Sequence, residues 1–83
     1  MNNQFLKVTI KNKDNSTIEE EVKAVSSFNE SGPFDLLPLH ENFISIIKDK
    51  LIIHKKDGSA KEITLERGVL KIFENEISIF LGI

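Results

Sequence analysis

The sequence contains no cysteine, tryptophan or tyrosine, and only four glycines and two prolines. Without cysteine it has no disulfide, no thiolate metal ligand and no thiol nucleophile, which suits a reducing compartment such as the cytoplasm. No run approaches the roughly 18 apolar residues that a membrane-spanning helix needs. The first residues, Met1 to Gln4, do not form the basic segment that opens a secretory leader. We therefore expect neither export nor membrane insertion, with the cytoplasm as the default location.

Residues that usually carry catalysis or hold cofactors are also sparse. The glycines are scattered, so there is neither a phosphate-binding glycine-rich loop nor a dinucleotide fingerprint, and no cofactor is expected. His40 and His54 stand fourteen residues apart and form no metal-binding pair. No serine lies in a Gly-x-Ser-x-Gly turn, and Asp35 with Glu41 is better explained as a solvated pair than as two catalytic carboxylates. We expect no catalytic and no metal-binding residues.

Charge and length point to one ordinary small domain. Eleven basic and thirteen acidic residues are interspersed and give a net charge of -2, so neither nucleic acid nor anionic lipid is favoured as a partner. Hydrophobic residues make up 40% of the 83 residues, which is typical of a globular protein. A chain of this size buries only about 60% of its unfolded surface. There is no internal repeat or linker, so residues 1–83 are predicted to form a single domain.

The dominant hydrophobic period is two residues, which is typical of half-buried strands. Leu6, Val8 and Ile10 alternate with polar residues, so one side of this segment meets a core and the other meets water. The segment 18–25 is open to two interpretations, because its apolar residues also fit a short helix. A lone helix with so thin an apolar stripe is marginal, and we favour a strand that begins at a sheet edge, where Glu20 escapes burial.

Further apolar segments are separated by short turn signals. Asp57-Gly58 is a strong hairpin signal and Glu74-Asn75 a weaker one, while Arg67-Gly68 suits a tight turn or a bulge. The expected fold is all-β, a small antiparallel β-sandwich or flattened barrel of about 8–10 short strands. The later strands are expected at residues 43–48, 50–55, 60–66, 69–73 and 76–81.

The segment Ser26 to His40 is the longest stretch without strand character. Loops of more than about 12 residues in compact domains are usually functional or disordered, and the apolar content of this one argues against disorder. We expect it to fold over the sandwich or to present part of itself to a partner.

One motif in this region is specific enough to suggest a family. The stretch that begins at Gly32 resembles Gly-x-Phe-Gly-Ile-Leu-Pro-Gly-His-Ala-Pro-Leu-Leu-Thr in the N-terminal β-sandwich domain of the epsilon subunit of F-type rotary ATP synthases. The residues that match at the same spacing are Gly32, Phe34, Leu37, Pro38 and His40, with Ser45 where the family often has Thr. The residues that depart from it are Asp35, Leu39, Glu41 and Asn42, where the family commonly has Gly, Gly, Ala and Pro. Flanking segments extend the resemblance over nearly the whole chain.

The resemblance implies a non-catalytic subunit of the central stalk, or rotor. Such a subunit couples the γ subunit to the membrane c-ring in proton- or sodium-driven ATP synthesis, and is peripheral at the cytoplasmic face of the cell membrane as part of the F1 sector. It implies contacts with γ and the c-ring, with no nucleic acid and no direct membrane insertion. Carried over residue by residue, the partner interface comprises Gly32, Phe34, Leu37, Pro38, Leu39, His40 and Ser45.

The resemblance also raises the question of a second domain. Typical family members continue into a C-terminal helical hairpin implicated in regulation, whereas this sequence stops at Ile83. The regulatory role is therefore expected to be missing, and a natural short form and a fragment both remain open. The alternative function is a non-catalytic β-sandwich binding module with a different protein partner. A small enzyme on the same fold is much less favoured, since clustered metal ligands and a general base are lacking.

Overall fold

The computed structural model describes residues 5–82, in which every regular element is a β-strand. Alternating buried and exposed side chains produce this result, as in Leu6–Lys11, where each inward residue is buried and its neighbours meet water. The six strands are β1 (Leu6–Lys11), β2 (Thr17–Asn29), β3 (Gly32–Leu36), β4 (Phe43–Lys55), β5 (Ala60–Phe73) and β6 (Glu76–Leu81). The all-β prediction is confirmed, and residues 18–25 are a strand rather than a helix.

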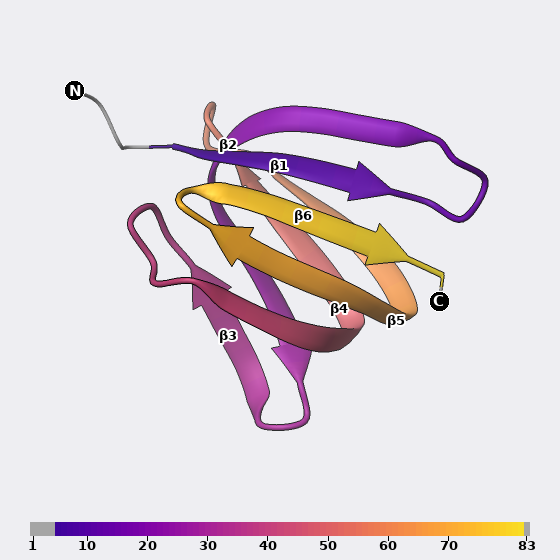
Figure 1. Ribbon diagram of the computed structural model, residues 1–83. Coiled ribbons are helices and arrows are strands. Elements are labelled where there is room, and N and C mark those ends of the chain that lie inside the picture. Colours follow the sequence, from indigo (N-terminus) through magenta and orange to yellow (C-terminus); the bar gives the residue numbers. More distant parts are fainter. Residues whose placement is uncertain (1–4, 83) are drawn as a thin grey trace.

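The strands close into a ring, which makes the fold a small flattened barrel. The sheet runs in the order β1-β6-β5-β4-β2-β3, and an additional pairing of β1 with β2 joins its ends (Figure 1). Five strands therefore form the barrel, and β3 extends beside β2. All neighbours are antiparallel except β1 and β6, which are parallel from Lys7↔Glu76 to Lys11↔Phe80. The sheet is thus mixed, where the sequence predicted only antiparallel pairing.

Strand β2 holds the barrel together by pairing with three strands. Its first half, Thr17 to Val22, pairs with β1, and its second half pairs with β3 on that edge and with β4 on the other. A register shift between Val22 and Ala24 bends the strand where its partners change. The expected edge position of Glu20 is confirmed, because Thr17 to Glu21 pair with β1 alone; Glu20 is half-buried there, and its carboxylate lies 3.5 Å from the Lys55 ammonium.

The structure has six strands instead of about 8–10, and three of them, β2, β4 and β5, are 13 or 14 residues long. The expected strands 43–48 and 50–55 are one strand, β4, and the expected strands 60–66 and 69–73 are one strand, β5. The pairing of β4 with β5 changes register in the middle. Ile47 is opposite Gly68 and Asp49 is opposite Leu65, so β5 has two residues where β4 has one. The resulting bulge bends both strands without ending either, which confirms the bulge alternative for Arg67-Gly68.

The expected long loop from Ser26 to His40 is also wrong. Strand β2 continues to Asn29 and turns back through Gly32 into β3, so most of this segment forms a hairpin. Gly32 has φ +116°, a left-handed conformation that suits glycine. The two predicted hairpin turns are confirmed, since Gly58 (φ +91°) joins β4 to β5, and Glu74 and Asn75, both with positive φ, join β5 to β6.

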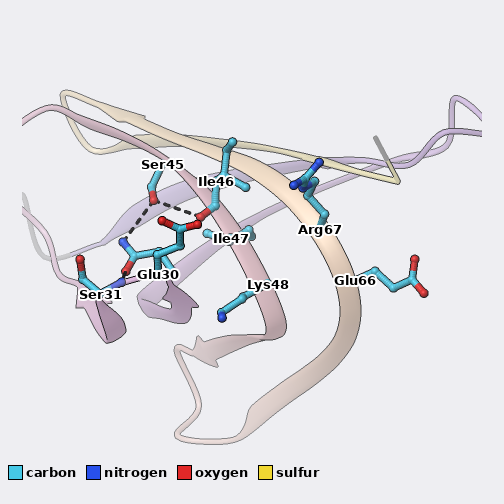
Figure 2. A pocket seen from close by; sticks show the side chains of 9 residues that line it. Glu30, Ser31, Ser45, Ile46, Ile47, Lys48, Glu66 and Arg67 are labelled. Carbon is cyan, nitrogen blue, oxygen red and sulfur yellow. Dashed lines mark hydrogen bonds between the residues drawn. The ribbon is translucent and has the colours of Figure 1, made fainter.

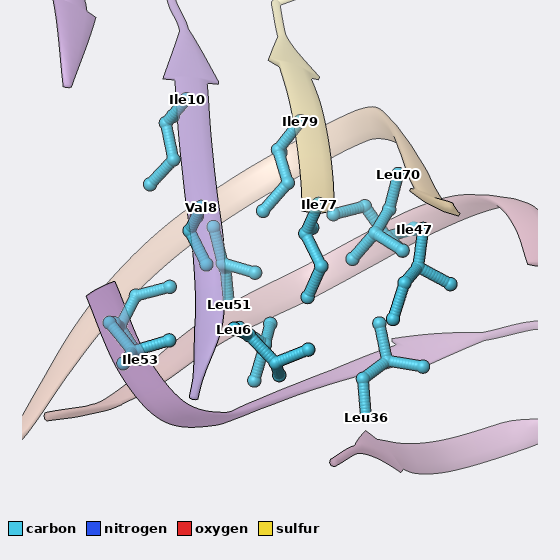
Figure 3. Close-up of a cluster of buried hydrophobic side chains, with 13 residues drawn as sticks. Leu6, Val8, Ile10, Leu36, Ile47, Leu51, Ile53, Leu70, Ile77 and Ile79 are labelled. Carbon is cyan, nitrogen blue, oxygen red and sulfur yellow. The ribbon is translucent and has the colours of Figure 1, made fainter. Parts of the chain in front are cut away.

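The core is a continuous apolar cluster inside the barrel. Figure 3 shows its side chains pointing toward one another from the surrounding strands. Each fully buried Leu, Ile or Val contributes about 1.5–3 kcal/mol relative to its exposed state. The core consists of Leu6, Val8, Ile10, Val22, Val25, Leu36, Ile47, Leu51, Ile53, Leu70, Ile72, Ile77 and Ile79. Within residues 5–82 there is no helix long and apolar enough to cross a membrane.

Candidate functional site

The predicted interface residues fall into two groups at different ends of β3. Leu37, Pro38, Leu39 and His40 form a tight turn between β3 and β4, closed by the His40 N–H, which donates to the Leu37 carbonyl at 3.1 Å. The other end of β3 holds Gly32, which is opposite Asn29 on β2, and the Asn29 side-chain amide donates to Ser45 on β4. Phe34 lies between these groups on β3 and packs against the core. We call residues Leu37–Asn42 the β3–β4 turn.

Leu39 has an unusual backbone conformation at the centre of this turn. Its φ is +70°, in the left-handed region where a residue with a Cβ is disfavoured by about 1–2 kcal/mol. Its side chain is 72% exposed, and that of Leu37 is 56% exposed. Little packing therefore compensates for the strain at Leu39. The turn therefore combines a backbone conformation that suits glycine with an exposed apolar side chain.

Two asparagine side chains fix the turn to the opposite hairpin. The Leu39 N–H donates to Asn75 Oδ1 at 2.7 Å, and the Glu74 N–H donates to Asn42 Oδ1 at 3.1 Å. The Asn75 carbonyl also accepts from the Lys7 N–H at 2.9 Å, which ties the same hairpin to the start of β1. In Figure 1 the β3–β4 turn lies beside the β5–β6 turn. The sequence did not predict Asn42 or Asn75 as part of the site, because their partners lie more than 30 residues away.

Aromatic rings support the turn from below. The Phe43 ring meets Phe34 edge to face at 5.5 Å and His40 at 5.9 Å between centroids. The carbonyl of Glu41 accepts from the His40 Nδ1–H at 2.7 Å, which fixes the imidazole orientation. Such edge-to-face pairs contribute about 0.5–1.5 kcal/mol beyond area burial. Phe34 and His40 thus act mainly inward, and Leu37 and Leu39 are the side chains that the turn presents to solvent.

Ser45 belongs to a separate hollow at the bulge. Its hydroxyl accepts from Asn29 Nδ2 at 3.2 Å and donates to the Ile46 carbonyl at 3.2 Å, as Figure 2 shows. The hollow measures about 510 Å³, and its lining includes two basic side chains, Lys48 and Arg67, and two acidic ones, Glu30 and Glu66. Mixed charges on an open surface do not select one class of small ligand.

A serine, a histidine and an aspartate also meet on the outside of the barrel, where the sequence gave no signal. The Ser26 hydroxyl donates to Asp35 Oδ1 at 2.5 Å, and His54 Nε2 lies 2.9 Å from the same hydroxyl oxygen. The single Ser26 proton is thus directed at the carboxylate, which leaves His54 Nε2–H as the donor. A nucleophilic serine requires the reverse, with the histidine as proton acceptor. The cluster is a cross-strand hydrogen-bond chain.

Shifted pKa values occur at two turns and in strand β4. The Ser59 hydroxyl and N–H lower the pKa of Asp57, and Ser16 lowers the pKa of Asp14 in the same way. The hydrogen bond from Lys50 to the Glu62 carboxylate raises the pKa of Lys50. Among residues 5–82 no three His, Asp or Glu side chains are placed to hold a metal ion. The β3–β4 turn thus presents exposed leucine side chains on a backbone held by hydrogen bonds.

Comparison with known families decides the assignment. The family described as "ATP synthase, Delta/Epsilon chain, beta-sandwich domain" matches residues 5–81. The chain belongs to this family. The match includes all six strands, so the family's β-sandwich domain corresponds to the whole barrel described above. The resemblance seen in the motif from Gly32 to Ser45 is therefore confirmed at the level of the family.

Solved structures of the same fold come from ATP synthases. A chain of the Euglena gracilis mitochondrial ATP synthase (OSCP/F1/c-ring in rotational state 1) superposes with a TM-score of 0.87 at 17% identity, covering 94% of this chain and 51% of that chain. A chain of the Tetrahymena thermophila mitochondrial ATP synthase (central stalk/c-ring) gives 0.75 at 9% identity, covering 98% and 66%. At these identities the likeness shows the fold alone. The present chain spans about half the length of the Euglena chain.

No curated protein sequence matches this delta/epsilon-family chain. The detailed roles of its residues therefore rest on its own geometry and on the family as a whole. Seven interface residues were predicted from the resemblance, and the structure brings four of them together in the β3–β4 turn while Gly32 and Ser45 lie apart.

Proposed function

We propose that this chain is a central-stalk subunit of an F-type ATP synthase, coupling a γ subunit to the membrane c-ring during proton- or sodium-driven ATP synthesis. Residues 1–83 act in it as one domain. The observation that carries the proposal is the match of the delta/epsilon β-sandwich family across residues 5–81. In this role the domain is peripheral at the cytoplasmic face of the cell membrane, and it transmits torque without catalysing a reaction.

The β3–β4 turn is the proposed contact with the rotor partners. Leu37 and Leu39 supply exposed apolar anchors, and Asn42 and Asn75 hold the backbone that carries them. Interfaces gain most of their energy from a few apolar or aromatic anchors in a polar rim. A pre-ordered turn also avoids the entropy that a mobile loop loses on binding. Transmission of torque requires this kind of stiffness.

The strain at Leu39 supports an interface role for that residue. A glycine would adopt φ +70° without penalty, yet the chain carries a leucine that packs little and remains mostly in water. Strained residues of this kind persist where function uses them. Pro38 and His40 flank this residue in the turn. Phe34, Gly32 and Ser45 act less directly, by setting the position of β3 and β4.

Co-purification with the γ subunit of the same organism tests the proposal. A tagged chain is co-expressed with γ, and the wild type is compared with the double variant Leu39→Asp and His40→Ala. Aspartate tolerates positive φ better than leucine, so the variant is expected to stay folded. A matched control is Asn15→Asp with His54→Ala, which makes the same change in charge at an exposed turn and a strand elsewhere.

A stable complex that the control retains and the double variant loses supports the rotor function and the place of the contact. A complex that survives the double variant unchanged contradicts the assignment of the β3–β4 turn. If γ is not captured although circular dichroism shows a folded wild type, the alternative function is favoured, a non-catalytic β-sandwich module with a different protein partner.

A further inference from the structure

The outward side of β4, β5 and β6 carries apolar side chains around one lysine. Strand β5 lies between β4 and β6 (Figure 1), and on the outside of the barrel Lys71 stands between Ile44 on β4 and Ser78 on β6. In the next outward row Ile46 stands opposite Val69, which stands opposite Phe80. We call this surface the β4–β6 face, formed by Ile44, Ile46, Val69, Lys71, Phe73 and Phe80.

The apolar members of this face are not needed for the core. Ile44 is 67% exposed and Ile46 58% exposed, while Phe43 packs against the core and Ile47 belongs to the cluster of Figure 3. Phe73 and Phe80 are also exposed. Single exposed apolar residues are common, but a contiguous group on adjacent strands marks an interaction site.

Charge on this face is unlike that of the whole chain, whose net charge is -2. Lys71 takes part in none of the ion pairs formed among residues 5–82, which involve Lys50, Lys55 and Lys56. On the adjoining strand β1, Lys7 and Lys11 point to the same side, and the Lys11 ammonium lies 5.8 Å from the centre of the Phe80 ring. One acidic residue, Glu76 on β6, lies in these rows, opposite Phe73 on β5 and Lys7 on β1.

The central lysine limits the chemistry of any partner. A purely apolar partner would remove the Lys71 ammonium from water without a counter-charge, which is strongly unfavourable. A carboxylate placed among apolar side chains satisfies the ammonium and keeps the apolar contacts with Ile44 and Phe73. The dimensions indicate the kind of element. Neighbouring strands lie about 4.8 Å apart, so three strands span about 10 Å, which is the diameter of one α-helix.

We propose that the β4–β6 face docks an acidic amphipathic helix of a partner protein, with one Asp or Glu of its apolar stripe on Lys71. From Val69 to Phe73 the strand rises about 13 Å, which corresponds to two to three helical turns. Apolar side chains at helical spacing contact Ile44, Ile46 and Phe80, and Lys7 and Lys11 meet further acidic residues at the margin. This inference goes beyond the proposed function, since it concerns another face and holds whatever the β3–β4 turn contacts.

Two other occupants fit less well. A second copy of the chain offers its glutamates 19–21, but Glu20 and Glu21 are already paired with Lys55 and Lys56. An anionic membrane favours clusters of about 4–8 basic residues at the margin of an apolar surface. Here one lysine stands at the centre of the apolar group, where a single carboxylate fits better than a layer of headgroups.

The test uses the full 83-residue chain, ¹⁵N-labelled, and a pair of synthetic amphipathic helical peptides. Both peptides carry the same leucine stripe, and the residue at its centre is Glu in one and Lys in the other. We expect the Glu peptide to shift the amide signals of Ile44, Lys71 and Phe80 in a saturable way. Lys71→Glu should weaken this binding by about tenfold and strengthen binding of the Lys peptide. Lys61→Glu changes the net charge equally at an exposed site outside the face and should change neither peptide's affinity.

Equal affinity for the two peptides, or equal effects of Lys71→Glu and Lys61→Glu, would overturn the inference, because binding would then follow net charge or apolar contact alone. Shifts confined to other strands would do the same. Two further arms address the competing occupants: vesicles of phosphatidylglycerol, and dilution of the chain alone. If the amide signals of the face shift with vesicles but with neither peptide, the partner is a membrane. If they shift on dilution of the chain alone, the partner is a second copy. If Lys71→Glu fails to fold, Lys71→Gln provides the same comparison without the reversed charge.

Discussion

The backbone N–H of Leu39 donates to the side-chain oxygen of Asn75 at 2.7 Å, across 36 residues of sequence. Each partner has a positive φ, and each lies at the tip of a turn. The bond therefore joins two turns that the strand ladder alone leaves independent. It restrains the residue that the candidate contact surface exposes most.

Replacement of Asn75 tests this restraint. Asn75→Gly suits the positive φ but removes the acceptor, whereas Asn75→Asp keeps both an acceptor and tolerance of the left-handed region. A hydrogen bond of this kind contributes about 0.5–1.5 kcal/mol, so Asn75→Gly should speed amide exchange at Leu39 by about 3- to 10-fold. Hydrogen exchange followed by NMR gives the measurement. Equal protection of the Leu39 amide in the two variants would show that the side-chain bond is unimportant.

Leu39→Gly separates stability from binding. The substitution stabilises the folded state by removing about 1–2 kcal/mol of left-handed strain. Part of this gain is lost, because glycine also gives the unfolded chain more conformational freedom. Because the leucine side chain is 72% exposed, little burial is lost. We expect the free energy of unfolding in urea to rise by up to about 1 kcal/mol while capture of γ weakens. A clear loss of stability instead would mean that the leucine serves packing.

Gly68→Ala tests the close approach of β5 to β6. A Cβ at this position would lie 2.9 Å from the Phe80 carbonyl oxygen, with Leu81 and Ile47 at 3.2 and 3.4 Å. Backbone cannot retreat without disturbing the β5–β6 ladder, so we expect a loss of about 1–3 kcal/mol in urea unfolding. The control is Ala60→Gly at the exposed start of the same strand, which is expected to lose less than about 1 kcal/mol. An unchanged midpoint in Gly68→Ala would contradict the contact.

The pKa of Asp57 is predicted to depend on one hydroxyl. Asp57 Oδ1 accepts from the Ser59 hydroxyl at 2.6 Å and from the Ser59 N–H at 2.9 Å, and these bonds lower its pKa below 3.8. Ser59→Ala should raise the pKa of Asp57 toward that value. Asp14 with Ser16 has the same arrangement and serves as an internal control that should not move.

The sign of the accompanying stability change follows from the direction of the shift. A carboxylate with a depressed folded pKa stabilises the fold above its unfolded pKa, and that contribution disappears as pH falls through the folded pKa. In Ser59→Ala the free energy of unfolding should therefore differ less between neutral and acidic solution than it does in the wild type. Carboxyl ¹³C titration by NMR measures the pKa, and parallel unfolding at pH 7 and in acid measures the linkage. A pKa of Asp57 that stays unchanged would assign the whole shift to the backbone bond.

Local patterns in the sequence were sufficient for the strands and hairpin turns. Alternation in Leu6, Val8 and Ile10 predicted β1, and Asp57-Gly58 predicted a turn because both residues tolerate its backbone. Strand ends were predicted less well. The sequence predicted that strands end at Asp49 and at Gly68. In the barrel both residues lie beside a bulge, and the strands continue through it. Whether a strand bends or stops depends on pairing across the sheet, which the sequence does not state.

The site was predictable only as a motif. The resemblance predicted that Leu37 to His40 belong together, and the turn confirms this proximity. It said nothing of Asn42 and Asn75, whose role depends on contact between distant turns. The exposure of Ile44 and Ile46 was also missed. Strand β4 has isoleucines on both of its sides, so its sequence pattern does not show which side is buried and which meets water.

The parallel pairing of β1 with β6 has a consequence for how the protein folds. Lys7 meets Glu76, so the contact that completes the ring joins opposite ends of the chain and carries the largest loop-closure entropy. Proteins dominated by such distant contacts fold slowly, on a scale of about milliseconds to seconds. During synthesis, strands β1 and β5 each wait with one unpaired edge until β6 has left the ribosome. Those open edges are the part of the nascent chain most exposed to aggregation and most in need of a chaperone.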